Sequence, residues 1–245
     1  MTITDKLQSI KDLFPRIKVK GVELGKKENY REFWTKFQNG GDRTNYFYAF
    51  AGRCWNNETF KPLYPIFPVD NKASDRSAFG IFMYVAWQEE NPLDFKDYNF
   101  DFSYVLDATY LFRNANARNI TCDLSRARNL TQAFNCADGG NLDNIKIKVT
   151  SACTNFDRTF GHCANLTSLE FISGSELCES IDLSASKNLT AKSIESTVNA
   201  LSPTASGKTL TLSYDAVTNA DWSQTEAGGF ANLATGHPNW EFALV

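Results

Sequence analysis

Asn129-Leu130-Thr131-Gln132-Ala133-Phe134 is the clearest unit of a repeat in the middle of this 245-residue chain. Three further segments share its pattern and also end on a phenylalanine: Ala78-Phe79-Gly80-Ile81-Phe82, Thr109-Tyr110-Leu111-Phe112 and Asp157-Arg158-Thr159-Phe160. Repeats of about 20–50 residues are typical of solenoids, whose units cannot bury their own apolar edge and therefore stack around a shared core. We predict that Phe82, Phe112, Phe134 and Phe160 form a ladder along that core.

Runs typical of short strands follow the repeated turns, at residues 121–124, 145–149, 169–172 and 181–184. Ile145-Lys-Ile-Lys-Val149 alternates apolar and charged residues, which predicts one buried and one solvated face. We expect each repeat to hold a strand and a short helical or 3₁₀ turn. Small residues three positions after the phenylalanines, Ala115, Ala137 and Cys163, would let the turns pass closely. The alternative is a compact α+β domain with coincidental phenylalanine spacing.

One repeat resembles a known family. Phe160-Gly-His-Cys163-Ala-Asn-Leu166-Thr-Ser-Leu169 looks like the F-x-x-C-x-x-L-x-x-L unit of BspA-like leucine-rich repeats. Blocks at 49–62 and 181–210 resemble the flanks of a subset encoded among the structural genes of phages and prophages of gut bacteria. The repeats at Phe112 and Phe134 lack the cysteine of that unit.

The resemblance covers residues 20–215 and implies an α+β fold. That fold is a short irregular leucine-rich-repeat solenoid, with a strand and a short helical turn per repeat, a helical N-terminal region and an α/β C-terminal cap. It also implies a virion-associated surface or fibre-like protein, or more broadly a cell-surface adhesin. It brings no catalytic residues.

We divide the chain into four parts at its composition changes. Residues 1–20 form a docking or oligomerisation helix, 21–75 a helix followed by an extended, aromatic and proline-rich N-terminal cap, 76–184 the solenoid, and 185–245 the C-terminal cap. In the cap, Thr190 is expected to begin a helix that runs to about Leu201, followed by a strand at 209–213. One more helix and a closing strand are expected between Trp222 and Phe242.

The first helix carries an apolar seam, with spacings of 4, 3 and 4 residues between Ile3, Leu7, Ile10 and Phe14. Two heptads are too short for a self-sufficient coiled coil. The seam therefore predicts either a helix that packs on its own domain or a docking or oligomerisation stub.

Composition argues against several classes of protein. The net charge of −3 and the sequence pI near 5.5 disfavour a nucleic-acid-binding protein, which usually needs a basic surface. The sequence contains no run of about 18 apolar residues, so it predicts no membrane span. Met1-Thr-Ile-Thr-Asp5 lacks the features of a secretion signal.

Metal and thiol chemistry have little support in the sequence. The six cysteines form no C-x-x-C pair, and the chain holds only two histidines, His162 and His237. We expect the cysteines to be small buried residues and expect no cofactor and no metal site. His162 and Cys163 are adjacent in sequence, and neighbours seldom adopt the geometry of a catalytic couple.

Two further motifs have ordinary explanations. Ser206-Gly-Lys-Thr209 ends like a phosphate-binding loop, but Ser202 replaces the first glycine and the strand follows the motif instead of preceding it. The carboxylates at Glu89-Glu90 and at Glu176, Glu179 and Asp182 are of the type used in glycoside hydrolysis, but solvated carboxylates are common.

Together with the absence of a recognisable catalytic constellation, the resemblance implies a non-enzymatic phage virion protein, in a tail, a fibre or a head decoration. It would be made in the host cytoplasm and assembled into the virion. Its expected partners are other virion proteins, a glycan or protein of the host cell surface, and copies of itself, for example in a trimer. The alternatives are a bacterial surface adhesin of the same repeat class and a polysaccharide-degrading fibre protein.

Overall fold

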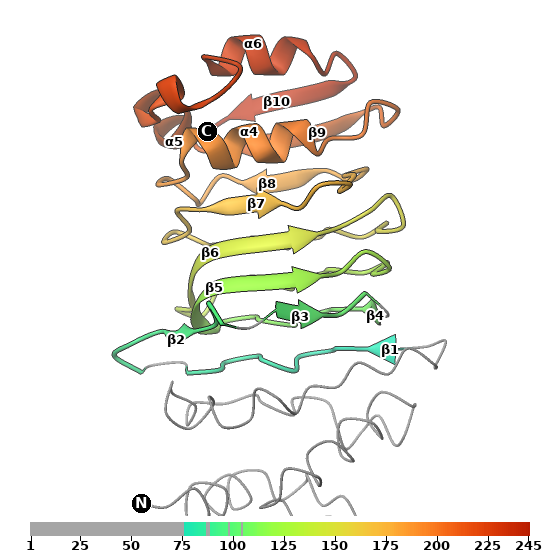
Figure 1. Ribbon diagram of the computed structural model, residues 1–245, viewed down its shortest axis with the longest axis vertical. Coiled ribbons are helices and arrows are strands. Elements are labelled where there is room, and N and C mark those ends of the chain that lie inside the picture. The colour runs from blue at the N-terminus through green and yellow to red at the C-terminus, as the bar shows by residue number, and fades with distance from the viewer. Residues whose placement is uncertain (1–75, 87–88, 98, 104) are drawn as a thin grey trace, which may run out of the picture.

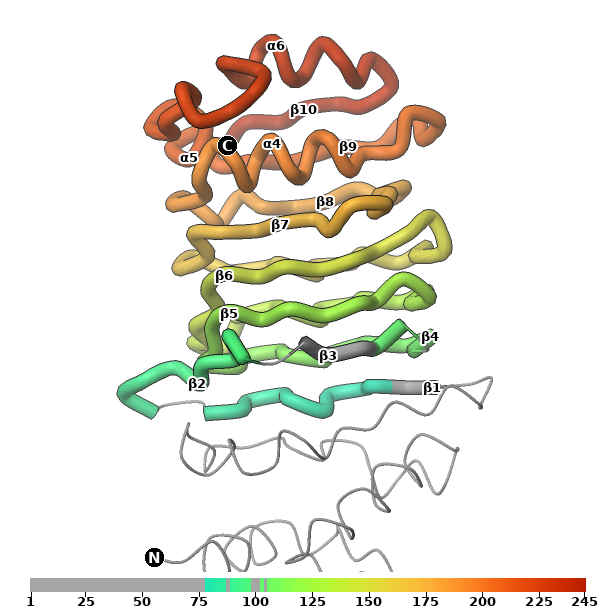
Figure 2. Tube along the Cα trace, viewed as in Figure 1, coloured from blue at the N-terminus to red at the C-terminus, as the bar shows by residue number. Residues whose placement is uncertain are grey.

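The computed structural model describes residues 76–86, 89–97, 99–103 and 105–245. These residues form a parallel β-solenoid of about five turns, with its coils stacked along the long axis of Figure 1. Figure 2 traces the chain from β1 at one end of the stack to α6 and β10 at the other. The docking residues Ile3, Leu7, Ile10 and Phe14, and the expected elements of 21–75, lie outside the described residues.

The coils contribute short strands. The strands of the solenoid are β1 (Arg76–Ser77), β2 (Leu93–Asp94), β3 (Asn99–Asp101), β4 (Val105–Asp107), β5 (Asn116–Asp123), β6 (Asn141–Lys148), β7 (Leu169–Phe171) and β8 (Ile181–Leu183). The C-terminal elements are α4 (Ala191–Asn199), β9 (Lys208–Leu212), α5 (Tyr214–Asn219), η3 (Trp222–Gln224), α6 (Phe230–Thr235) and β10 (Trp240–Leu244).

The main sheet has the order β2-β5-β6-β7, and β3 also pairs with β5. Ile120, Ile145 and Leu169 are in register across β5, β6 and β7, and all three are buried. The alternation expected in Ile145-Lys-Ile-Lys-Val149 is present, because Ile145, Ile147 and Val149 are buried while the lysines between them are partly exposed. One face of the sheet therefore closes the core and the other meets solvent.

The phenylalanine repeat becomes a continuous stack of rings. Phe82 stacks on Phe112, Phe112 on Phe134 and Phe134 on Phe160, with ring centroids 4.7, 5.7 and 5.5 Å apart and ring planes within 12° of parallel. All four side chains are at most 1% exposed. The rings thus fill the core from coil to coil, as the repeat predicts.

The turns that carry these rings differ from the expected helical or 3₁₀ turns. They are successive β-turns, and the residue two positions before each ladder ring has a positive φ, at Gly80, Tyr110, Gln132 and Arg158. The amide of Phe112 donates to the carbonyl of Ala133 in the next coil at 2.6 Å, and that of Phe134 donates to Thr159 at 2.9 Å. Amides that bond between coils cannot also form the bonds of a helix within one coil, which is why the turns are not helical.

The predicted small residues are inward at only two of three turns. Ala115 and Cys163 are buried, but Ala137 is exposed. Cys136, one residue earlier, faces the core instead. The prediction for Ala137 was wrong because the turn after Phe134 follows a different path, without the positive φ found at Asn114 and His162 in the neighbouring coils.

A column of polar side chains forms one corner of the stack. Asn119 and Asn144 bend their strands with φ values of 57° and 52°, a conformation that asparagine tolerates well. Nδ2 of Asn144 donates to Oδ1 of Asn119 at 3.2 Å, and Nδ2 of Asn119 donates to Oδ1 of Asp94 at 2.9 Å. The hydroxyl of Thr167 donates to Oδ1 of Asn144 at 3.4 Å and extends the column to the coil that contains Thr167. The corner therefore connects four coils through side-chain hydrogen bonds.

Helix α4 covers the last strand of the main sheet (Figure 1). As predicted, Thr190 caps it, because the Thr190 hydroxyl accepts from the amide of Ser193. The amides of Leu169 and Phe171 in β7 donate to the hydroxyls of Ser193 and Ser196 at 3.0 and 2.9 Å. The helix thus takes the place of a next strand and satisfies donors of an edge that would otherwise be open.

A second parallel sheet of order β10-β9-β8 completes this end. The expected strand at 209–213 is β9, and the expected closing strand is β10. Nε1 of Trp240 donates to the carbonyl of Ser202 at 2.9 Å, which anchors β10 to the loop before β9. Ser206-Gly-Lys-Thr209 is a turn into a strand, as predicted, with a positive φ at Gly207.

Candidate binding surfaces

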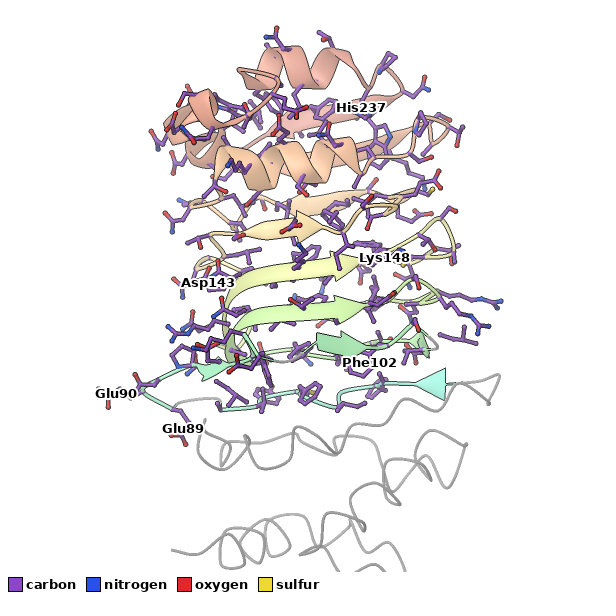
Figure 3. The ribbon with its side chains drawn as sticks, in the orientation of Figure 1. Glu89, Glu90, Phe102, Asp143, Lys148 and His237 are labelled. Carbon is purple, nitrogen blue, oxygen red and sulfur yellow. The ribbon has the colours of Figure 1, made fainter. Side chains whose placement is uncertain are left out.

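The outward face of β5, β6 and β7 is a polar surface made of side chains on parallel, paired strands. We call it the front face and define it by Arg118, Thr121, Asp123, Asp143, Lys146, Lys148 and Glu170. Asp143 and Lys148 lie toward opposite ends of β6 (Figure 3). Because the strands are parallel and in register, these side chains form rows that run across the coils.

Charges of opposite sign alternate along these rows. Thr121, Lys146 and Glu170 are in register, and Nζ of Lys146 forms an ion pair with Oε1 of Glu170. In another row Nη2 of Arg118 lies 3.2 Å from Oδ2 of Asp94. Exposed ion pairs contribute little to stability, typically below about 1 kcal/mol. Their main consequence is a surface with a fixed pattern of charge.

Asp94 anchors the edge of this face. Its carboxylate accepts hydrogen bonds from the backbone amide of Lys96 at 3.0 Å, from Asn119 at 2.9 Å and from Nε of Arg118 at 3.2 Å. Burial opposes the charge, but these hydrogen bonds and the Arg118 charge outweigh it, so the pKa of Asp94 lies below its usual value. The charge of Asp94 is therefore kept in mildly acidic solution.

Asp138 joins three coils on the turn side of the solenoid. Its Oδ2 accepts from the Tyr84 hydroxyl at 2.9 Å, from Nδ2 of Asn114 at 2.9 Å and from Nη2 of Arg113 at 3.3 Å. Burial, followed by the hydrogen bond to Asp138, raises the pKa of the Tyr84 phenol. Both features stabilise the neutral phenol, so this group of residues acts as a link between coils and provides no nucleophile.

The cysteines lie in the core, as predicted for Cys122, Cys136, Cys153 and Cys163. Cys178 is half-buried, and Cys54 lies outside the described residues. Sγ of Cys163 lies 3.6 Å from Sγ of Cys136 and 2.9 Å from the carbonyl oxygen of Phe134. The contact with Cys136 and burial both raise the pKa of Cys163. Buried thiols of raised pKa are unreactive structural residues.

The residues weighed for catalysis are not brought together. His162 is exposed while Cys163 is buried, so the two side chains lie on different sides of the chain. Glu176 accepts from the hydroxyl of Ser202 at 2.7 Å, and Glu179 accepts from Nζ of Lys208 at 2.7 Å. Each of these carboxylates has its own structural partner.

The remaining carboxylates are separate from that group. Asp182 accepts from the amide of Ser184 in a local turn. Glu89 and Glu90 project from the coil that contains β2, far from β8 along the stack (Figure 3). Within the described ranges, no three His, Cys, Asp or Glu side chains are placed to hold a metal ion. None of the helices described there is long and apolar enough to cross a bilayer.

A cavity of about 500 Å³ lies at the C-terminal end of the solenoid. Its walls are the segment 187–192, which leads into α4, and residues between 215 and 224 in α5 and η3. It was not predicted, because these two segments are distant in sequence and share no motif.

The corner column was also missed, although a signal for it exists. Asn116 and Asn119 recur 25 residues later as Asn141 and Asn144, which is one coil of the stack. Asparagine pairs at the coil spacing could have indicated this column.

No protein-family model, curated protein or solved structure matches the chain.

Proposed function

We propose that the chain is a non-enzymatic structural and binding protein of a bacteriophage particle, in a tail, a fibre or a head decoration. Its repeats resemble BspA-like leucine-rich repeats of the phage-encoded subset, and this resemblance supports the assignment to a virion. Stacked repeats suit such a role, because a solenoid offers a long, rigid flank for contact.

The front face is the observation that carries the proposal. It holds Arg118, Lys146 and Glu170 on strands that pair in parallel and in a fixed register. The backbone of a rigid sheet loses little conformational freedom on binding, so the ordering cost of association is limited to the side chains. We assign to this face the contacts with other virion proteins or with a glycan or protein of the host surface.

Residues 1–20 are proposed to dock or oligomerise the protein, through Ile3, Leu7, Ile10 and Phe14. A trimer would present three front faces and multiply a weak contact. Light scattering on the full chain and on a chain that begins at Gly21 tests this part. We expect a multiple of the 27.5 kDa chain mass for the first and the monomer for the second; monomers in both samples contradict it.

The assignment to a particle is tested by analysis of purified virions. Mass spectrometry of gradient-purified particles should detect the protein in a constant ratio to the capsid protein, and labelled antibodies should locate it on intact particles. Its presence only in the envelope fraction of uninfected cells would favour the bacterial adhesin.

The role of the front face is tested by charge reversal. We expect Lys146→Glu with Lys148→Glu to weaken binding to host cells or to the neighbouring virion protein by about tenfold or more. Arg118 is left unchanged, because it supports Asp94. Arg126→Glu with Arg128→Glu is the matched control, since both arginines are exposed in the turn after β5. Equal losses in the two double variants would remove the front face from the proposal.

A further inference from the structure

The cavity near α4 has the size and lining of a small-ligand site. Its volume of about 500 Å³ is within the range of small-molecule pockets, which is about 300–1,000 Å³. It lies between the start of α4 and helix α5, beside the end of the main sheet, because the amide of Thr190 in its lining donates to the carbonyl of Thr167 just before β7. The amide and the hydroxyl of Thr167 donate in turn to Oδ1 of Asp143, so a ligand in the cavity would lie near one edge of the front face.

The floor of the cavity is apolar and made of small side chains. Leu189, Ala191 and Ala216 line it and are at most 3% exposed. Alanine at two of these positions leaves the space that a larger side chain would fill. Because so little of these side chains is exposed, they shape the cavity but offer a ligand little apolar surface.

The rim is polar and carries no net charge. Lys187 and Lys192 share the rim with the acidic residues Asp215 and Asp221, and Nζ of Lys187 lies 3.7 Å from Oδ2 of Asp215. Asn219 adds a carboxamide, which both donates and accepts hydrogen bonds. Two positive and two negative groups give no net attraction for a strongly charged ligand.

We propose that this cavity binds an uncharged pyranose sugar, as the terminal unit of a surface glycan. Such a ring is compact enough for the space beside the two alanines, and its hydroxyl groups match the mixed donors and acceptors of the rim. The carboxylates of Asp215 and Asp221 accept from hydroxyls, while Lys192 and Asn219 donate to ring and hydroxyl oxygens. This inference rests on the proposed binding function and assigns it a ligand class.

The expected affinity is weak. No aromatic ring lines the cavity, and aromatic rings supply much of the contact energy at compact sites. A dissociation constant on the order of 1 mM corresponds to about −4 kcal/mol and suits a site that acts through several copies at once.

Saturation-transfer NMR on the full chain tests the inference, with glucose, galactose and N-acetylglucosamine as probes and a sugar phosphate as the charged comparison. We expect transfer to at least one uncharged sugar. The double variant Lys192→Ala with Asn219→Ala should lower that transfer at least tenfold. Asn199→Ala, at the exposed far end of α4, is the matched control and should bind like the unmodified protein. Thermal melts establish that all three proteins are folded.

Three outcomes overturn the inference: no transfer from any uncharged sugar, equal transfer in the double variant, or stronger binding of the sugar phosphate. Binding to host cells separates this inference from the proposed function. If the double variant binds cells as well as the unmodified protein does, the pocket is not the site and the binding function stands. If neither protein binds cells or occurs in particles, the proposed function fails, whatever the NMR titration reports about the cavity.

Discussion

Single residues hold neighbouring coils together by repeating at the same place in each coil. Phe134 has Phe112 on one side and Phe160 on the other, with centroids 5.7 and 5.5 Å away. Parallel rings at this distance add to the free energy gained by burial. Phe134 is therefore part of two interfaces between coils, and its loss affects both.

We expect Phe134→Ala to lower the free energy of unfolding by about 3–5 kcal/mol, because it leaves a cavity in the middle of the stack. Urea denaturation followed by circular dichroism measures this. Phe242→Ala is the control, since it removes the same atoms from a half-buried position in β10 and should cost less. Equal losses at the two positions would show that the stack is not the main source of stability.

The buried thiols make stability depend on pH in alkaline solution. Burial raises the pKa of Cys122, and it raises the pKa of Cys153 to about 11. Thiols with a raised pKa in the folded state contribute stability that is complete below the unfolded-state pKa, near 8.5, and is lost as pH rises toward the folded-state value. The free energy of unfolding should therefore fall between about pH 8.5 and 11.

For a single thiol such as Cys122, the loss at pH 9.5 relative to pH 7.5 is about 1.4 kcal/mol. Urea denaturation of Cys122→Ala should therefore show a pH-dependent loss smaller by this amount. Ile147→Val tests whether core disruption alone explains the change, because Ile147 is in register with Cys122 and carries no titrating group. An unchanged pH dependence in Cys122→Ala would contradict the assignment.

At the scale of elements, α4 occupies the position of a next strand beside β7 and supplies acceptors for its amides. The hydroxyls of Ser193 and Ser196 accept hydrogen bonds from the amides of Leu169 and Phe171. A helix places residues three apart on the same face, so these two serines can both reach β7. This explains how the main sheet ends at β7 without an open row of donors.

We expect Ser193→Ala and Ser196→Ala each to lower the free energy of unfolding by about 1–3 kcal/mol, because each leaves an amide of β7 without an acceptor. Hydrogen exchange should be faster at Leu169 in the first variant and at Phe171 in the second. Asn199→Ala, at an exposed position of the same helix, should leave both amides protected. Protection that survives the serine substitutions would mean that the hydroxyls are dispensable.

At the scale of the molecule, the solenoid needs a cap at its C-terminal end. Coils contact only their neighbours, so the last coil would expose the rings and strand edges that the next one covers. The sheet β10-β9-β8 and helices α4, α5 and α6 supply that cover (Figure 1).

Deletion of residues 185–245 should therefore produce a protein that aggregates, because the edge of β7 and the core beside Leu177 and Ile181 would be uncovered. Size-exclusion chromatography with light scattering measures this. Removal of Val245 alone, which is 66% exposed, is the control and should leave the oligomeric state unchanged. A soluble truncated protein of defined mass would show that the coils are stable without the cap.

Much of this architecture could be predicted because it depends on local spacing. A phenylalanine at a similar point of each coil, at Phe82, Phe112, Phe134 and Phe160, indicates stacking whatever the exact coil length. Alternation in Ile145-Lys-Ile-Lys-Val149 predicts a strand with one wet face, and Thr190 followed by an apolar helical face predicts a capped helix. The last two signals each lie within one short segment, and the first is a simple repeat along the chain.

The remaining features depend on which residues become neighbours after stacking. The segments that carry the ladder rings form β-turns because some of their amides donate to carbonyls of the next coil. Cys136 faces the core in place of Ala137 because the turn after Phe134 follows a different path. The contact of Asn119 with Asn144 and the cavity between 187–192 and 215–224 join segments that are distant along the chain. The spacing of residues along the sequence indicates the period of the stack, whereas contacts between coils arise only when the chain is folded.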